Sequence, residues 1–155
     1  MRSILLSLLL LCGSPVAFPD EAGEVVRVFK VFDGSRFLAR TRYHSLRLSL
    51  DGVRAPAVAD VEGQMSKKIL EQMVLSKRVE YTPLGEPIDG VQPARVRWLD
   101  KDINLEMIRA GYAWVWPRDS GRHPDLLAAE QQARDEKRGL WAEITPLPPW
   151  QKWAD

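Results

Sequence analysis

The sequence predicts an α+β protein in which a small, curved, mainly β barrel is covered by packed helices. Two observations lead to this expectation: five β-type segments lie before residue 100, and three helical segments are interleaved with them or follow them. The chain has 155 residues, of which 45% are apolar and 28% charged, which suits one domain with a real core and excludes wholesale disorder. With 22 Lys and Arg against 21 Asp and Glu, a uniformly basic nucleic-acid wrapper is excluded as well.

The first three strands are predicted from β-branched runs and from alternation. Residues 24–32 form the first run, which ends at Asp33-Gly34, a pair that accepts the positive φ of a tight turn. A second run begins at Phe37. In the third, Leu46, Leu48 and Leu50 alternate with polar residues, so one face of that strand should be buried.

A helix is predicted over Val61 to Lys77, where the period changes. Its apolar stripe would consist of Met65, Ile69, Leu70, Met73 and Val74. A strand from Arg78 to Thr82 should follow directly. The proline-rich segment from Pro83 to Pro93 is typical of a surface loop, and Ala94 to Trp98 alternates as a fifth strand.

Two further helices complete the prediction. Asp102 or Asn104 can cap a short helix that ends at Gly111, and the last helix should begin at Pro124 and end at Gly139. Leu140 and Trp141 are then expected to fold back as hydrophobic clasps. This order of elements is that of a five-stranded OB-fold-like barrel with three packed helices.

The chain ends are expected to lie outside this domain. Residues 1–17 carry a positive start, an apolar stretch and small residues, as a secretory signal peptide does, and fall short of the roughly 20 apolar residues of a membrane span. A hydrophobic first strand is the alternative, and Leu11 before Cys12 disfavours a lipoprotein anchor. We therefore predict a signal peptide over 1–17, a barrel domain over 24–142, a Pro- and Trp-rich tail over 143–155, and a secreted or periplasmic protein.

The scarcity of cysteine and histidine removes several chemistries. Cys12 is the only cysteine, so a mature chain would have no disulfide and no cysteine nucleophile. The two histidines, His44 and His123, cannot form a zinc cluster with it. We interpret both as surface residues without a metal partner.

Two segments carry a family resemblance. They are Asn104-Leu105-Glu106-Met107-Ile108-Arg109-Ala110-Gly111-Tyr112-Ala113-Trp114-Val115 and, later, Ala128-Ala129-Glu130 with Lys137-Arg138-Gly139-Leu140-Trp141. Through them the chain resembles the thermonucleases, or staphylococcal-nuclease-like domains, over about Val25 to Trp141. The closing Pro148-Pro149-Trp150 is also typical of exported members.

The pieces that carry the family's chemistry are altered. The Asp-Gly-Asp-Thr turn corresponds to Asp33-Gly34-Ser35-Arg36, so only the first carboxylate is retained. In the second piece, from Ser49 to Ala57, the glycine and proline are kept. There, Ser49 replaces an arginine, Arg54 the metal-binding aspartate and Ala57 the catalytic glutamate. Gln92 falls where the second arginine is expected.

The resemblance therefore implies that calcium-dependent phosphodiester cleavage has been lost. A calcium ion needs several hard oxygen ligands, whereas Asp33 stands alone here. A positive charge such as Arg54, placed about 4 Å from a divalent cation, costs roughly 8 kcal/mol at an effective dielectric of about 20. We expect no catalytic residues, no metal and no cofactor. If the protein were an active nuclease instead, its cofactor would be calcium.

Cations gather in the first half of the chain. Seven basic residues against two acidic ones lie between Arg27 and Arg54. We interpret most of them as the solvated faces of strands, paired with the acidic helices; the alternative is a cationic face for single-stranded nucleic acid or another polyanion. The candidate anion-binding residues are Arg47, Arg54, Arg36 and Arg95, of which the first two border the inherited groove.

Aromatic residues are assigned mainly to the core. Those placed in the core or in a clasp are Phe29, Phe32, Trp98, Trp114 and Trp141, with base stacking as the alternative use; Tyr43 should be exposed in a turn. Three functions stay open: a non-catalytic binding module for nucleic acid or another polyanion, a protein-interaction or envelope module using the tail, and an active calcium-dependent nuclease. We expect a monomer.

Overall fold

A closed five-stranded barrel forms the body of the computed structural model, which describes residues 23–142 and 147–152. Its strands are β1 (Glu24–Val31), β2 (Arg36–Arg40), β3 (Ser45–Leu50), β5 (Arg78–Pro83) and β6 (Val91–Trp98). They are adjacent in the order β3-β2-β1-β5-β6, and a parallel pairing of β3 with β6 closes the ring. The predicted OB-fold-like α+β barrel is confirmed.

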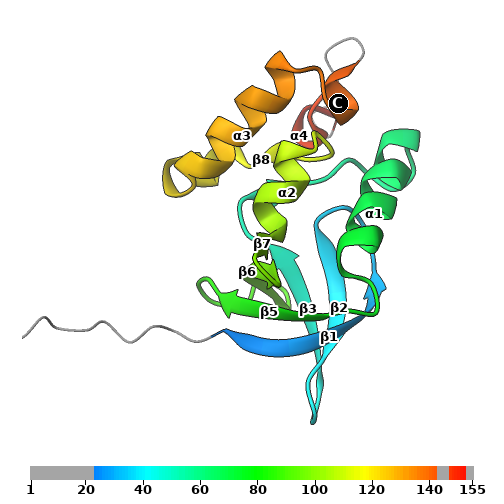
Figure 1. Ribbon diagram of the computed structural model, residues 1–155, viewed down its shortest axis with the longest axis vertical. Helices are drawn as coiled ribbons and strands as arrows, with labels where there is room; N and C mark the ends of the chain where they lie inside the picture. The colour runs from blue at the N-terminus through cyan, green and yellow to red at the C-terminus, as the bar shows by residue number, and fades with distance from the viewer. Residues whose placement is uncertain (1–22, 143–146, 153–155) are drawn as a thin grey trace, which may run out of the picture.

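The helices cover one end of this barrel, with the strands in the lower half of Figure 1 and the helices in the upper half. They are α1 (Val61–Val74), α2 (Ile103–Arg109), α3 (Pro124–Asp135) and the short α4 (Pro149–Lys152). Short elements connect them: β4 (Val53–Arg54), β7 (Lys101–Asp102), β8 (Trp114–Val115), and the 3-10 turns η1 (Pro117–Arg122) and η2 (Gly139–Ala142). Among the described helices, none has the length and apolar character to cross a membrane. The predicted signal peptide lies outside the described residues.

The core follows the predicted alternation. Leu48 and Leu50 of β3 are fully buried, whereas Arg47 is exposed and Ser49 half-buried. The largest fully buried side chains come from both the barrel and the helices: Phe37, Leu48, Leu50, Leu70, Ile103, Met107, Ile108 and Leu126. One continuous core therefore fixes the helices on the barrel end where the candidate site lies.

The β1–β2 turn needs its glycine for space. Gly34 does not have the positive φ that the sequence suggested. A Cβ at Gly34 would instead lie 1.7 Å from Ser66 Oγ, which donates a hydrogen bond of 2.6 Å to the carbonyl of Tyr112. The turn that carries Asp33 is thus pressed directly against α1.

Two predicted boundaries were wrong by a few residues. Helix α1 ends at Val74 rather than Lys77, and the Lys77 ammonium instead donates to the carbonyls of Gln72 and Met73 at the C-terminus of the helix. Met65, assigned to the buried stripe, is 49% exposed. Strand β6 begins at Val91, inside the predicted loop, because its pairing with β3 extends to that residue.

The last part of the chain shows both agreement and one further difference. Asp102 caps α2 as predicted, since its Oδ1 accepts the backbone N–H of Leu105 at 2.9 Å. Trp141 packs edge-on against Trp114 with ring centroids 5.8 Å apart, which confirms the clasp. Helix α3, however, ends at Asp135, and positive φ values at Lys137 and Gly139 reverse the chain after it.

Candidate functional site

The retained carboxylate of Asp33 is fully engaged within its own turn. Its Oδ1 accepts the backbone N–H and the hydroxyl of Ser35, at 2.8 and 2.9 Å, and the N–H of Arg36 at 2.9 Å. Its Oδ2 accepts Arg36 Nε at 2.7 Å and lies 2.6 Å from Nη2 of the same guanidinium. Because Asp33 is only 6% exposed, neither oxygen is free to act as a ligand. The guanidinium that pairs with Asp33 is that of Arg36, not that of Arg54.

Arg54 occupies β4 as a half-buried cation without a carboxylate partner. Its Nη1 donates to the carbonyl of Val53 at 3.0 Å, and its guanidinium carbon lies 4.7 Å from the centroid of the Trp116 ring. Within the described parts of the chain it makes no ion pair. Burial lowers the pKa of Arg54, and the positive charge of Arg36 acts in the same direction, against the raising effect of Asp119 and Asp51.

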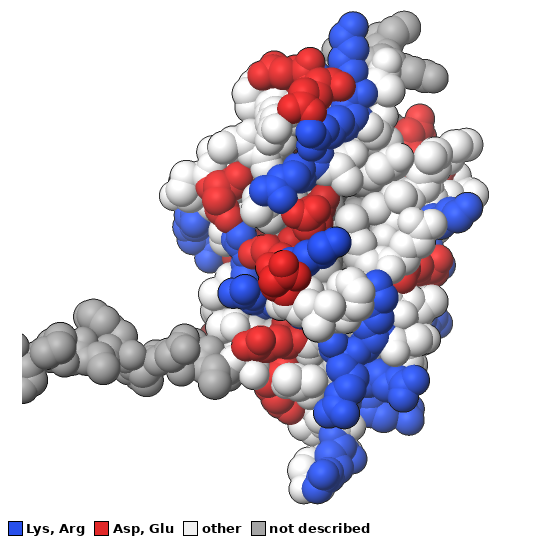
Figure 2. Space-filling view, viewed as in Figure 1, with Lys and Arg blue, Asp and Glu red and all other residues white. Residues whose placement is uncertain are grey.

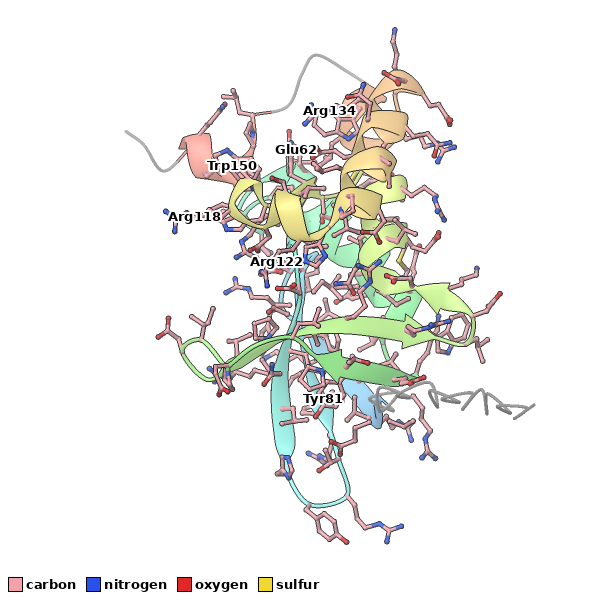
Figure 3. The ribbon with its side chains drawn as sticks, turned by 90° about the vertical axis from the view of Figure 1, so that its left-hand side faces the viewer. Glu62, Tyr81, Arg118, Arg122, Arg134 and Trp150 are labelled. Atoms are coloured by element: carbon pink, nitrogen blue, oxygen red, sulfur yellow. The ribbon has the colours of Figure 1, made fainter. Side chains whose placement is uncertain are left out.

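Trp116 forms the floor under Arg54, and sequence reasoning missed it. Its backbone N–H donates to the carbonyl of Gly52 at 2.8 Å, while β4 and β8 pair beside it. The Trp150 ring meets it edge-on at 5.3 Å, and the Arg118 guanidinium lies 5.7 Å from its centroid. Figure 3 shows Trp150 of α4 close to the segment that carries Arg118 and Arg122. Only the aromatic run from Tyr112 to Trp116 hinted at this in the sequence.

A pocket of about 260 Å³ opens beside the Asp33 turn. It is lined by Phe32, Arg36, Phe37, Arg47, Leu48 and Val91. Arg47 is exposed, shares a face of β3 with Ser49, and forms no ion pair with any residue that the structure describes. The pocket thus combines two guanidinium groups with an apolar wall.

The remaining replaced positions hold groups without acid or base chemistry. Ser49 faces Arg36 across the β2–β3 ladder. Ala57 is exposed, and its carbonyl accepts the N–H of Asp60 at 3.0 Å. The Gln92 amide donates to the carbonyls of Gly85 and Pro93, both at 2.9 Å, so this side chain supports its own loop.

Arg95, one of the four candidate anion-binding residues, is already neutralised. Its guanidinium bridges Asp102 and Asp125. Burial by itself lowers the pKa of Arg95, but the hydrogen bonds and charges of Asp125 and Asp102 outweigh it and raise the pKa. The alternation that predicted a cation on this strand could not show that two carboxylates from β7 and α3 converge on it. Arg95 is therefore a structural residue.

The expectation that both histidines lie on the surface was wrong for His123. This residue is 6% exposed, and its Nε2 lies 2.8 Å from Oδ2 of the buried Asp51. His44 is exposed in the β2–β3 turn, as predicted. No group of three or more His, Cys, Asp or Glu side chains converges on one point among residues 23–142 and 147–152.

Comparison with known proteins identifies the family and supports the fold. Residues 47–143 match the family described as staphylococcal nuclease homologue. An uncharacterized endonuclease of Haemophilus influenzae is 32% identical over 151 residues, which is 97% of this chain and 84% of that protein. An uncharacterized endonuclease of Escherichia coli O157:H7 is 31% identical over 97% of this chain and 96% of its own. A micrococcal nuclease of Shigella flexneri is 26% identical over 99% and 91%, respectively. This chain belongs to the staphylococcal nuclease homologue family.

Proposed function

We propose that this protein is a non-catalytic member of its family, whose former cleft binds a phosphodiester chain such as single-stranded nucleic acid. The observation that carries the proposal is the state of Arg54, a half-buried guanidinium without an ion-pair partner in the described residues, stacked over Trp116. Burying an unpaired charge is costly, so an external anion would relieve it. An arginine fork also suits phosphate oxygens in particular.

Loss of catalysis follows from the groups that surround Asp33. Calcium needs several oxygen ligands, but both oxygens of Asp33 are occupied by Ser35 and Arg36. The charge of Arg54 repels a divalent cation, and Ala57 supplies no base to activate water. These residues do not fit a calcium ion.

Two cations and an aromatic ring would hold the ligand. Arg47 and Arg36 line the pocket, and Arg36 is close enough to influence the pKa of Arg54. Because Arg36 is paired with Asp33, Arg47 and Arg54 are the guanidinium groups that would contact phosphates. Bases would stack on Phe32, which lines the pocket, since aromatic faces accept any base.

Binding to labelled single-stranded DNA tests the proposal. The mature wild-type chain should bind with an affinity that falls steeply with salt, because each phosphate contact releases a counterion. Arg47→Ala should weaken binding about tenfold, and Arg54→Glu, which reverses a charge, by more. Lys68→Ala removes an exposed charge from α1 and is the control. If the affinity depends neither on the salt concentration nor on the two cleft substitutions, the protein-interaction module is favoured instead.

The alternative of an active calcium-dependent nuclease is supported by the names of the relatives, which are called endonucleases, and by Glu62, an exposed carboxylate in the first turn of α1. Incubation with single-stranded DNA and calcium decides it. Turnover abolished by Asp33→Ala or Glu62→Gln would establish the nuclease. Under our proposal, activity appears only when Ser35→Asp, Ser49→Arg, Arg54→Asp and Ala57→Glu are combined to rebuild the family site.

We also propose that the protein is secreted or periplasmic, on the basis of its first 17 residues. Their charged start and apolar stretch are those of a secretory signal. Cell fractionation with an antibody against the barrel domain tests this. A cytoplasmic protein that still carries Met1 would exclude export.

A further inference from the structure

We infer that the outer face of β1, β2 and β5 is a second contact surface for single-stranded nucleic acid, built on a row of three arginines. Arg27 of β1 pairs directly with Arg40 of β2 on one side and with Arg78 of β5 on the other. All three side chains are exposed. Neighbouring strands lie about 5 Å apart, so the row crosses three strands within about 10 Å. We call these three residues the arginine row.

The fold does not account for this arrangement. Like charges placed directly opposite each other on neighbouring strands destabilise a sheet. The expectation that the cations of 27–54 lie on solvated strand faces is confirmed for Arg27 and Arg40, but neither forms an ion pair with a helix in the described residues. Arg27, Arg40 and Arg78 make no ion pair in the part of the chain that the structure describes. A bound polyanion would remove the repulsion.

Exposed aromatic residues flank the row. Phe29, which was assigned to the core, is 41% exposed because it lies on the same side of β1 as Arg27, opposite the buried Val26 and Val28. The Arg40 guanidinium lies 5.0 Å from its ring centroid. Tyr43, in the β2–β3 turn, is 86% exposed. Alternation of cations with aromatic faces is the arrangement by which proteins hold single strands without reading their sequence.

The row continues the cleft rather than standing apart from it. Arg36 and Arg40 both point outward from β2, four residues and about 13 Å apart. Figure 2 shows Lys and Arg gathered at the lower right of the molecule, over the region of β1, β2 and the start of β5. One flexible strand could therefore run from the cleft along β2 to the row. The inference rests on the proposed function for the chemical class of the ligand and for the cleft that the row would extend.

Oligonucleotide length separates the two sites. Fluorescence anisotropy would use labelled oligothymidylates of about 5 and about 20 nucleotides, chosen to bracket the roughly 4–16 nucleotides that one OB fold covers. For the double variant Arg27→Ser and Arg78→Ser, affinity for the long probe should fall about tenfold, and its salt slope should decrease by about 1.4 for two lost phosphate contacts. Affinity for the short probe, which the cleft alone can hold, should not change.

Two further double variants control for the change in net charge and for misfolding. Lys68→Ser with Lys101→Ser removes the same charge from exposed positions on α1 and β7 and should leave the salt slope intact. Arg27→Lys with Arg78→Lys should bind the long probe almost as the wild type does. If the row variant and the lysine control weaken the long probe equally, the row is not a site, whereas loss of binding in Arg54→Glu would still support the cleft. If only the row variant weakens binding, the row stands and the proposed function of the cleft fails.

Discussion

His123 Nε2 lies 2.8 Å from Oδ2 of Asp51, and the two side chains form a buried pair between segments that are distant in sequence. Asp51 follows β3, and His123 joins η1 to α3. Gly52 leaves room for the imidazole, because a Cβ there would lie 2.6 Å from His123 Cδ2. The Gly52 carbonyl in turn accepts the N–H of Trp116. The pair therefore holds Trp116 beside the strand that carries Arg54.

Removing the imidazole should loosen this junction. His123→Ala leaves the Asp51 carboxylate buried, with Arg122 at 3.7 Å as its remaining ion-pair partner among the described residues, and should lower the free energy of unfolding by about 2–3 kcal/mol. Urea denaturation measures the loss, and a double-mutant cycle with Asp51→Asn measures the coupling. Additive effects of the two substitutions would show that the pair contributes little.

The barrel could be predicted from the sequence because its signals are local. Alternation in 46–50, the cap at Asp102 and the reversal at Gly139 each depend on a few neighbouring residues. Strand β6 was placed too late because its first residues are ordered by pairing with β3, a contact that no local pattern records. Phe29 was assigned inward as an aromatic residue in a β-branched run, but it shares the exposed side of β1 with Arg27, while Val26 and Val28 are buried.

The candidate site was predicted less completely, because the partners of its charged residues lie far away in the sequence. The loss of carboxylates could be found residue by residue from the family resemblance. The partners of the remaining charges could not, since Arg95 meets Asp125 across 30 positions and His123 meets Asp51 across 72. Trp116 under Arg54 depends on the pairing of two-residue strands, which is too short a pattern to predict.

The close approach of Gly34 to α1 predicts a steric effect of a single methyl group. Gly34→Ala would place its Cβ against Ser66 Oγ, which is held by Tyr112, and should cost about 1–3 kcal/mol of stability. Thermal denaturation measures this. Ser66→Gly in the same chain removes the obstructing hydroxyl and should recover part of the loss. An equal loss in both chains would mean that the strain lies in the backbone.

Stability should depend on pH through Asp125. The first influence on this carboxyl is burial, which raises its pKa, but the hydrogen bond and charge of Arg95 outweigh it, so the pKa is lowered from 3.8. A lowered pKa in the folded state contributes stability above about pH 4 that is lost as the pH falls through the folded value. The wild type should therefore be more stable than Asp125→Asn at neutral pH, and the difference should shrink as the pH falls below about 4 and vanish below the lowered folded pKa. Denaturation curves at neutral and at acidic pH measure this difference in stability. Asp100→Asn is the surface control. A difference in stability that persists at acidic pH would exclude the charge effect.

Replacing Arg54 by an apolar side chain of similar length separates a structural role from a binding role. Arg54→Met keeps the contact with Trp116 and removes a half-buried guanidinium that has no carboxylate partner in the described chain. The cation–π contact is worth about 0.5–2 kcal/mol, but burial of the unpaired charge opposes it. The free energy of unfolding should therefore stay unchanged or rise by up to about 1 kcal/mol, while affinity for single-stranded DNA falls at least tenfold. Urea denaturation and anisotropy on the same preparation measure both quantities.

A clear loss of stability with intact binding would make Arg54 a structural residue and would remove the basis of the anion site. A more stable protein that no longer binds would show that the arginine is kept for its ligand.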